Sequence, residues 1–469
     1  MAWVGGCWNC CDAKMTLRIL IPLWLLASSL AAETKPNILL IMVDDLGWTD
    51  LHCQGNARLS TPNIDRLAGQ GMRFTDAYAA APVCSPTRAA VLTGQSPARL
   101  RITNHIPDRP GFARKDAVLV SAPMLDHLPT EAVTIAELLK KSGYATAFFG
   151  KWHLAGESRG KDGLGDLQFY PEQQGFDINL GGCALGARPS YSDPFRIHNL
   201  PPRQTGDYLP DRLADELIHF LRGNRTGPFL AFLWNYTVHW PMEAPEPLVK
   251  KYRDRTDLGR LDPRYAAMIE ALDSSVGRVL SALDELNLTK DTLVVFTSDN
   301  GAFGGVSDLA PLREAKGYLY EGGLRVPLLA RWPGVIPPGT VCGEPVISMD
   351  FFPTFLEAAG LPPPTEPSSE GESLLPLFRQ SGLLQRGEIF FHYPHFAFHG
   401  SNRPGSAMRQ GHFKLIENFD DGSLELYDLK EDLGETRNLA PELPQQAESM
   451  RQQLQAWRDE TRAALPTRR

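Results

Sequence analysis

Four apolar runs that each end in polar residues constrain the fold of this 469-residue chain more than any other feature. The runs cover residues 37–43, 145–149, 229–233 and 292–298. A strand that is apolar on both faces is typical of a parallel sheet buried between helices. Because open α/β sheets place their sites at the carboxyl ends of strands, we expect the polar residues after these runs to meet there.

Segments with apolar residues at helical spacing separate the runs and predict helices over 61–70, 134–142, 209–222 and 263–286. This alternation indicates an α/β fold with a large, mainly parallel sheet between layers of helices. After a proline-rich loop that begins at Leu361, short segments at 388–393, 406–416 and 424–429 precede a helical stretch at 444–464. They predict a smaller antiparallel sheet with a terminal helix.

The N-terminus has the pattern of an export signal. Lys14 and Arg18 precede an apolar run from Ile19 to Ala27, and small residues follow up to Ala32. The run is shorter than the roughly 20 residues that span a bilayer, so a membrane anchor is the weaker alternative. We therefore expect a signal peptide over 1–32, a catalytic domain over 33–365 and an α+β subdomain over 366–469. The mature protein is expected to be exported, to the periplasm, the medium or a lumen, without a stable membrane anchor.

Charge and cysteine content exclude several classes of function. The net charge is −8 and lysines and arginines form no run, which argues against nucleic acid as a partner. Beyond the predicted signal, four cysteines remain, at positions 53, 84, 183 and 342. Their spacing is neither that of a zinc site nor that of a disulfide framework.

Four oxygen-bearing residues follow the first and last apolar runs: Asp44, Asp45, Asp299 and Asn300. Calcium and magnesium prefer carboxylate and amide oxygens, whereas zinc prefers histidine or thiolate. Either pair alone is ordinary turn chemistry. Their placement after two buried strands favours a site for one hard cation.

Residues 84–88, Cys-Ser-Pro-Thr-Arg, are followed by Ala-Ala-Val-Leu-Thr-Gly. Alone, this pattern fits a proline-bounded turn before a short helix. Three further motifs stand at Gly150-Lys-Trp-His153, at Val238-His-Trp-Pro241 and around Lys316. Together they resemble type I sulfatases, members of the alkaline phosphatase-like superfamily, over most of residues 36–440.

The resemblance implies that Cys84 is oxidised to a Cα-formylglycine by a converting enzyme. One hydroxyl of the aldehyde hydrate would attack sulfur, with Asp299 as a proton acceptor, and expel the alcohol to leave an enzyme sulfate. The second hydroxyl, deprotonated by His153, would then release sulfate. The resemblance also makes Asp44, Asp45, Asp299 and Asn300, with residue 84, the ligands of one calcium ion, although these residues do not distinguish calcium from magnesium.

The resemblance assigns Arg88 to the formylglycine hydrate, Lys151 and Lys316 to the sulfate oxygens, and His239 to the sulfate and the leaving oxygen. The implied function is hydrolysis of sulfate monoesters, of aryl sulfates in vitro and sulfated carbohydrates in vivo. Two alternatives stay open: a phosphatase or phosphonate hydrolase of the same fold, and a sulfated-glycan binding protein without catalysis.

Substrate recognition is expected in three loops: Asn104-His105, residues 181–198 and residues 392–403. Sulfatases also carry a polar residue between the regions of His153 and His239. The sequence does not identify this residue, although Ser190 and Ser192 lie in range, so that role stays open.

Overall fold

The computed structural model describes residues 35–157, 164–188, 190–224, 227–364 and 369–469. The predicted signal peptide lies outside the described residues. From Lys35 to Arg469 the chain forms one compact unit. The division into domains at residue 365 stays a prediction.

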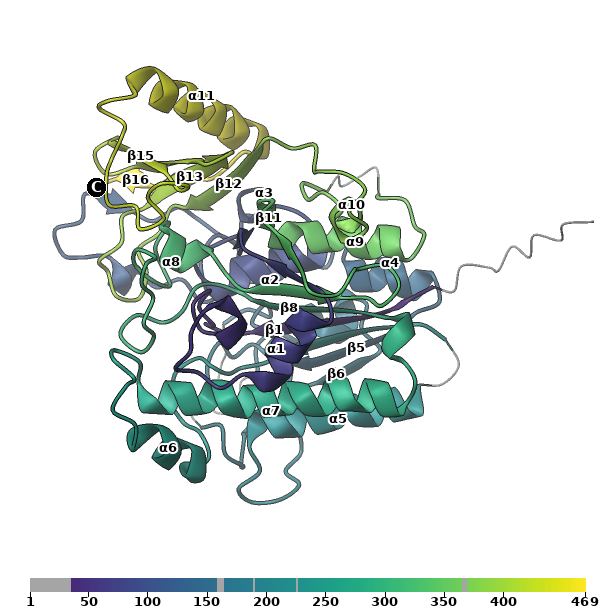
Figure 1. Ribbon diagram of the computed structural model, residues 1–469. Coiled ribbons are helices and arrows are strands. Elements are labelled where there is room, and N and C mark those ends of the chain that lie inside the picture. The colour runs from purple at the N-terminus through teal and green to yellow at the C-terminus, as the bar shows by residue number, and fades with distance from the viewer. Residues whose placement is uncertain (1–34, 158–163, 189, 225–226, 365–368) are drawn as a thin grey trace, which may run out of the picture. The chain divides into compact units, whose positions relative to one another are not determined.

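An eight-stranded sheet forms the centre of the fold (Figure 1). Its strands, in spatial order, are β10 (Thr340–Cys342), β2 (Met72–Phe74), β9 (Leu328–Arg331), β8 (Thr292–Ser298), β1 (Asn37–Val43), β7 (Phe229–Trp234), β5 (Ala145–Gly150) and β6 (Ile178–Leu180). Strand β9 pairs antiparallel with both β8 and β2, and the other neighbouring pairs are parallel. The four predicted strands are therefore confirmed as the central β8, β1, β7 and β5.

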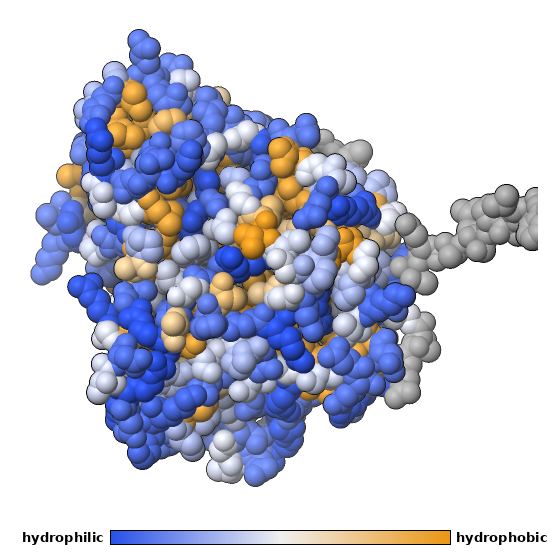
Figure 2. All heavy atoms as spheres, viewed as in Figure 1, coloured by the Kyte–Doolittle hydropathy of each residue, from blue (hydrophilic) through white to orange (hydrophobic). Residues whose placement is uncertain are grey.

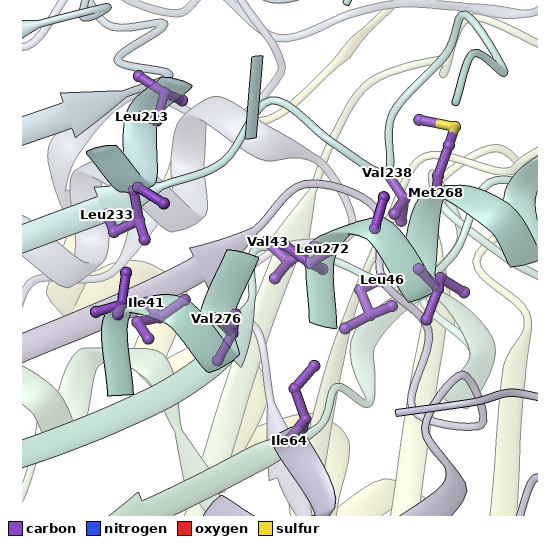
Figure 3. Packing of buried hydrophobic residues seen from close by; sticks show 14 of the residues in the cluster. Ile41, Val43, Leu46, Ile64, Leu213, Leu233, Val238, Met268, Leu272 and Val276 are labelled. Carbon is purple, nitrogen blue, oxygen red and sulfur yellow. The ribbon is translucent and has the colours of Figure 1, made fainter. Parts of the chain in front are cut away.

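Helices cover both faces of this sheet because the β1 side chains alternate between two buried layers. Leu39, Ile41 and Val43 contact the layer that holds α1 (Pro62–Gly69), α5 (Leu209–Gly223), α6 (Glu246–Arg253) and α7 (Pro263–Glu285). Figure 3 shows Ile41 and Val43 packed close to Leu272 and Val276 of α7.

The opposite side chains of β1, Ile38, Leu40 and Met42, face the second layer. This layer holds α2 (Cys84–Thr93), α4 (Ile135–Lys141), α9 (Phe351–Ala358) and α10 (Leu375–Phe378). The residues of β1 in both layers are fully buried, which explains why its sequence is a continuous apolar run. Smaller elements are α3 (Pro97–Leu100), α8 (Glu321–Leu324) and the strand pairs β3 (Ala77–Tyr78) with β11 (Val346–Ile347) and β4 (Leu119–Val120) with β16 (Thr467–Arg468).

The C-terminal segment forms a separate antiparallel sheet with one long helix. The strands are β12 (Glu388–Tyr393), β13 (Gly405–Gln410), β14 (Phe413–Asn418) and β15 (Leu424–Asp428), in that order, and α11 (Pro444–Thr461) packs on β13–β15. The stretch predicted as one segment, 406–416, is two strands that turn at Gly411, whose φ of 58° suits glycine. One face of this sheet buries Ala407 and Ile416 against Leu319 and against Leu324 of α8.

No described helix is long and apolar enough to cross a membrane. On the face shown in Figure 2, hydrophilic residues dominate and hydrophobic residues occur in small groups among them.

Candidate active site

The structure brings all ten predicted site residues to the carboxyl ends of the central strands. Asp44 and Asp45 follow β1, Asp299 and Asn300 follow β8, Lys151 and His153 follow β5, and His239 follows β7. Cys84 and Arg88 lie on the first turns of α2, and Lys316 lies in the loop after Asn300. Because β8, β1, β7 and β5 are neighbours, segments far apart in sequence meet at one place.

Four oxygen-bearing residues form the floor of the site, and each is fully buried: Asp44, Asp45, Asp299 and Asn300. Asn300 Nδ2 donates to Asp45 Oδ1 at 2.7 Å, which turns its own Oδ1 away from that carboxylate. The Asp45 amide donates to Asp299 Oδ1 at 3.2 Å. Asp45 has a φ of 62°, in the left-handed region where a non-glycine residue is uncommon. This strained backbone at the end of β1 is a recurrent feature of functional sites.

Three buried oxygens of this set accept no hydrogen bond from the described residues: Asp44 Oδ1, Asp45 Oδ2 and Asn300 Oδ1. An unsatisfied buried carboxylate oxygen costs on the order of several kcal/mol unless a cation compensates its charge. Ligand atoms of Asp44, Asp45 and Cys84 all lie within 4.8 Å of one another. The residues therefore fit a hard divalent cation.

Arg88 is buried among these carboxylates and joins two strand ends. Its Nε and Nη2 donate to Asp299 Oδ2 at 3.0 and 2.6 Å, and Nη1 donates to the carbonyl oxygen of Lys151 at 2.6 Å. Its guanidinium lies 5.4 Å from the ring centroid of Trp234. A lysine could not make these contacts together, because the guanidinium supplies a planar fork of donors.

Two buried lysines hold the remaining carboxylates. Lys151 Nζ lies 2.6 Å from Asp44 Oδ2, and Lys316 Nζ lies 2.5 Å from Asp45 Oδ1. Burial is the largest single influence and raises both carboxyl pKa values, but the neighbouring positive groups together outweigh it, so the pKa of Asp44, beside Lys151, and of Asp45, beside Lys316, is lowered. Three carboxylates thus face three cations, so an added divalent ion makes the site net positive and suited to an anionic ester.

Cys84 is the first residue of α2, and Lys316 Nζ donates to its Sγ at 3.3 Å. Burial raises the pKa of the Cys84 thiol to about 11, although Lys151 and Lys316 oppose the shift. An unconverted Cys84 is therefore a protonated thiol at neutral pH and a poor nucleophile. The N-terminal end of a ten-residue helix also favours negative charge at this position.

His153 presents one ring nitrogen as a proton acceptor. Its Nε2 contacts the Ile106 carbonyl oxygen, which can only accept, so the proton is assigned to Nε2. Nδ1 is then the unprotonated nitrogen, and it is buried without a partner among the described residues. Burial and then Lys151 lower the pKa of His153 well below its usual value, which keeps the ring neutral. Its φ of 61° is a second strained position at the end of a strand.

His239 lies on the solvent side of the site. Its Nε2 is 3.7 Å from Asp45 Oδ2, and its Nδ1 faces the Trp240 carbonyl oxygen at 2.7 Å. The side chain is 17% exposed, whereas the other nine predicted residues are at most 4% exposed. Among these ten residues, His239 is therefore the most open to solvent. Burial and then Lys316 lower its pKa.

Two residues near His153 were not predicted from the sequence. Ser85 Oγ donates to the His153 carbonyl oxygen at 3.0 Å and accepts from the Ile106 amide at 3.1 Å, so it holds the backbone on both sides of the imidazole. Gly186 lies against the imidazole itself, since a Cβ at this position would come within 2.3 Å of the ring. The serine within the Cys-x-Pro-x-Arg motif was a signal for the first, and the second lies in the loop 181–198 that was expected to contact substrate, although its contact with His153 was not predicted.

Several polar residues of the predicted recognition loops bond to other groups of the protein. Ser190 and Ser192 both donate to Glu243 Oε1, at 3.0 and 2.6 Å. His392 is buried and contacts Ser406 Oγ and the Ala464 carbonyl oxygen, and His395 is buried against Thr103. Later residues of the same loop, Phe398 and His399, do lie near the site, because His399 Nε2 is 3.3 Å from the Lys316 carbonyl oxygen.

The mainly parallel sheet brings carboxylates, cations and a helix-terminal cysteine together at its strand ends. This arrangement defines the class of hydrolases that bind a cation and an anionic ester. The sulfatase family profile matches residues 36–361, and the profile for the C-terminal region of N-sulphoglucosamine sulphohydrolase matches residues 315–462. The chain therefore belongs to the sulfatase family.

Individual proteins agree with this assignment. The chain is 34% identical to a sulfatase of Formosa agariphila, over 95% of this chain and 93% of the relative. It is 35% identical to arylsulfatase A of Homo sapiens, over 88% and 85% of the two chains. The crystal structure of Ps i-CgsB in complex with k-i-k-neocarrahexaose superposes with a TM-score of 0.76 at 27% identity, and the match covers 90% of this chain and 93% of that one. The chain is a sulfuric ester hydrolase with an alkaline phosphatase-like fold, as the sequence predicted.

Proposed function

We propose that this sulfatase hydrolyses sulfate monoesters of carbohydrates with a formylglycine formed from Cys84 and one calcium ion. The observation that carries the proposal is the surroundings of Cys84. It starts a buried helix, contacts Lys316 and lies within 4.8 Å of ligand atoms of Asp44 and Asp45. Members of the family generally use a formylglycine and a divalent cation, and a formylglycine-generating enzyme is the partner that this chemistry needs during maturation.

The cation would be held by Asp44, Asp45, Asp299 and Asn300, together with the converted residue 84. Three oxygens of this set lack other partners, which supports their role as ligands. When bound, the ion supplies positive charge for the sulfate oxygens and for the residue 84 oxygen. Calcium is our choice from the family's usage, and magnesium is the alternative.

The hydrate at residue 84 supplies a hydroxyl that attacks sulfur and a second hydroxyl whose deprotonation releases sulfate. Lys316 contacts both Asp45 and residue 84, and Lys151 contacts Asp44, so both lysines can shift to the sulfate oxygens when an ester binds. Arg88 fixes Asp299 and the Lys151 backbone around the hydrate, and Asp299 is the proposed acceptor of the first proton. His153 Nδ1 is the acceptor for the second proton, and His239 faces the leaving oxygen at the open side.

Aryl sulfates are expected to be substrates in vitro. A carbohydrate substrate in vivo is supported by Ps i-CgsB, which was crystallised with k-i-k-neocarrahexaose and resembles this chain over most of its length. The phosphatase alternative predicts preference for an aryl phosphate over the aryl sulfate with the same leaving group. We expect the reverse.

We also propose that the protein is exported. The support is the charged and then apolar pattern before residue 32. Detection of the mature protein in the cytoplasm with residues 1–32 attached would contradict this part of the proposal.

Metal content tests the ligand set without depending on activity. Purified protein should contain about one calcium or magnesium ion per chain. Asp45→Asn and Asp299→Asn should lose it after dialysis against a chelator and reloading, because each removes a charged ligand. Asp50→Asn is the matched control, since Asp50 is equally buried but bonds to Gly47, Tyr265 and Ser307. Equal metal content in all three variants, or stoichiometric zinc in the wild type, would contradict the proposed site.

A further inference from the structure

Five aromatic rings form a continuous row beside the site. Trp240 stacks on Phe303 with centroids 6.3 Å apart and planes 9° apart, and Phe303 stacks on Phe398 at 5.3 Å and 13°. Phe398 meets His399 edge to face at 4.9 Å, and His399 stacks on Tyr318 at 4.6 Å and 12°. We call Trp240, Phe303, Phe398, His399 and Tyr318 the aromatic row.

The row is attached to the residues that surround the sulfate position. Trp240 follows His239, Phe303 is three residues after Asn300, and Tyr318 is two residues after Lys316. His399 bonds directly to the Lys316 backbone. A group esterified to the bound sulfate would therefore emerge among these rings.

The row is accessible, unlike the buried groups beneath it. Trp240 is 46% exposed, which is high for a tryptophan, and His399 is exposed, while Phe303, Phe398 and Tyr318 are half-buried. Aromatic surface that stays open to solvent beside a site commonly serves binding. None of the five rings takes part in the hydrolytic steps proposed above.

Polar groups interrupt and border the row. Ser401 Oγ lies 2.7 Å from the Tyr318 hydroxyl and 2.9 Å from His399 Nδ1. The Arg264 guanidinium lies 5.8 Å from the Trp240 ring centroid. A sugar ring combines apolar C–H faces with hydroxyl groups at its edge, so it matches aromatic surface with a polar border. A wholly apolar leaving group, such as a steroid, would cover this polar border without forming a hydrogen bond to it.

We infer that the aromatic row binds the sugar ring that carries the sulfate and so determines the substrate class of this enzyme. The inference rests on the proposed function, since it assumes that the sulfate lies against Lys316 and His239. The row contributes to binding of the leaving group, whereas binding of the sulfate itself does not depend on the row.

Kinetics on a panel of esters test the inference: 4-nitrophenyl sulfate and monosulfated disaccharides of galactose, N-acetylgalactosamine and N-acetylglucosamine. Trp240→Ala and Phe303→Ala should each lower kcat/KM on the best disaccharide by about 3- to 10-fold, mainly through KM. The inhibition constant of inorganic sulfate should stay within about twofold of wild type. Trp240→Tyr should recover most of the loss, because it restores an aromatic ring.

Trp457→Ala is the matched control. Trp457 lies on the C-terminal helix and stacks on Phe390, with ring centroids 5.1 Å apart and planes 8° apart. Unchanged kcat/KM in the row variants, an equal loss in Trp457→Ala, or an equally weakened inhibition by sulfate would each overturn the inference. A loss confined to 4-nitrophenyl sulfate would overturn the carbohydrate class. A wild-type enzyme that hydrolyses none of these esters, although residue 84 is converted, would instead contradict the proposed function.

Discussion

Replacing Lys414 with methionine should destabilise the protein, because Lys414 neutralises two buried carboxylates between the two sheets. Its Nζ lies 2.9 Å from Glu321 Oε1 and 2.9 Å from Glu435 Oε1, and all three side chains are fully buried. Methionine keeps most of the apolar stem and leaves the carboxylates without this cation. Removal of one partner from a buried ion pair costs about 3–5 kcal/mol. Since Arg325 Nε remains 3.0 Å from Glu321, we expect a loss of about 3 kcal/mol.

That loss predicts a measurable shift in the melting temperature. A unit of this length has an unfolding entropy of about 0.9 kcal/mol per kelvin, so the midpoint should fall by about 3 °C. Differential scanning calorimetry at pH 7 measures it, with the exposed Lys430→Met as the control. Adding Glu321→Gln and Glu435→Gln should recover most of the loss, because no uncompensated charge remains. A midpoint for Lys414→Met within 1 °C of both wild type and control would refute the reasoning.

Two further predictions concern the site and pH. Cys84→Ser supplies one hydroxyl and no geminal partner, so it should react once with an aryl sulfate and remain as the serine sulfate. His153→Ala should instead accumulate the sulfate ester of the formylglycine hydrate while turning over about 10²- to 10⁴-fold more slowly than wild type. Intact-protein mass after incubation detects the adduct, and steady turnover of an aryl sulfate or phosphate by Cys84→Ser would contradict the mechanism. Burial raises the pKa of Glu435 from 4.5 to about 7, so its contribution to stability is complete below pH 4.5 and is lost as the pH rises through 7. The free energy of unfolding of Glu435→Gln relative to wild type should therefore increase between pH 4.5 and 7, and denaturant titrations that show a constant difference would contradict this.

The central strands could be predicted because a strand that is buried on both faces requires a continuous run of apolar residues. The runs at 37–43 and 292–298 coincide with β1 and β8. The short outer strands β2 and β10 have three residues each, too few for a pattern, and the reversed direction of β9 depends on contacts distant in sequence. The hairpin inside 406–416 was missed because its turn, at Gly411, interrupts the polar and apolar alternation by only two residues.

The residues that meet at the strand ends could be named from the sequence as candidates, whereas their pairings could not. Asp44 and Lys151 are 107 residues apart, and Arg88 and Asp299 are 211 apart, so only the order of the strands determines which charge meets which. The aromatic row could not be predicted for the same reason, since its rings come from four segments that only the fold brings together. The support of His153 by Ser85 of α2 and by Gly186 depends on contacts between segments distant in the sequence, which carry no periodic signal.

Peptide mass spectrometry of residue 84 in active enzyme tests the central claim most directly. Protein expressed with a formylglycine-generating enzyme should carry formylglycine at this position, in proportion to its activity on 4-nitrophenyl sulfate. Protein from a host without that enzyme should be folded and nearly inactive, with the unmodified thiol. Full activity in a preparation that contains only cysteine at position 84 would contradict the account.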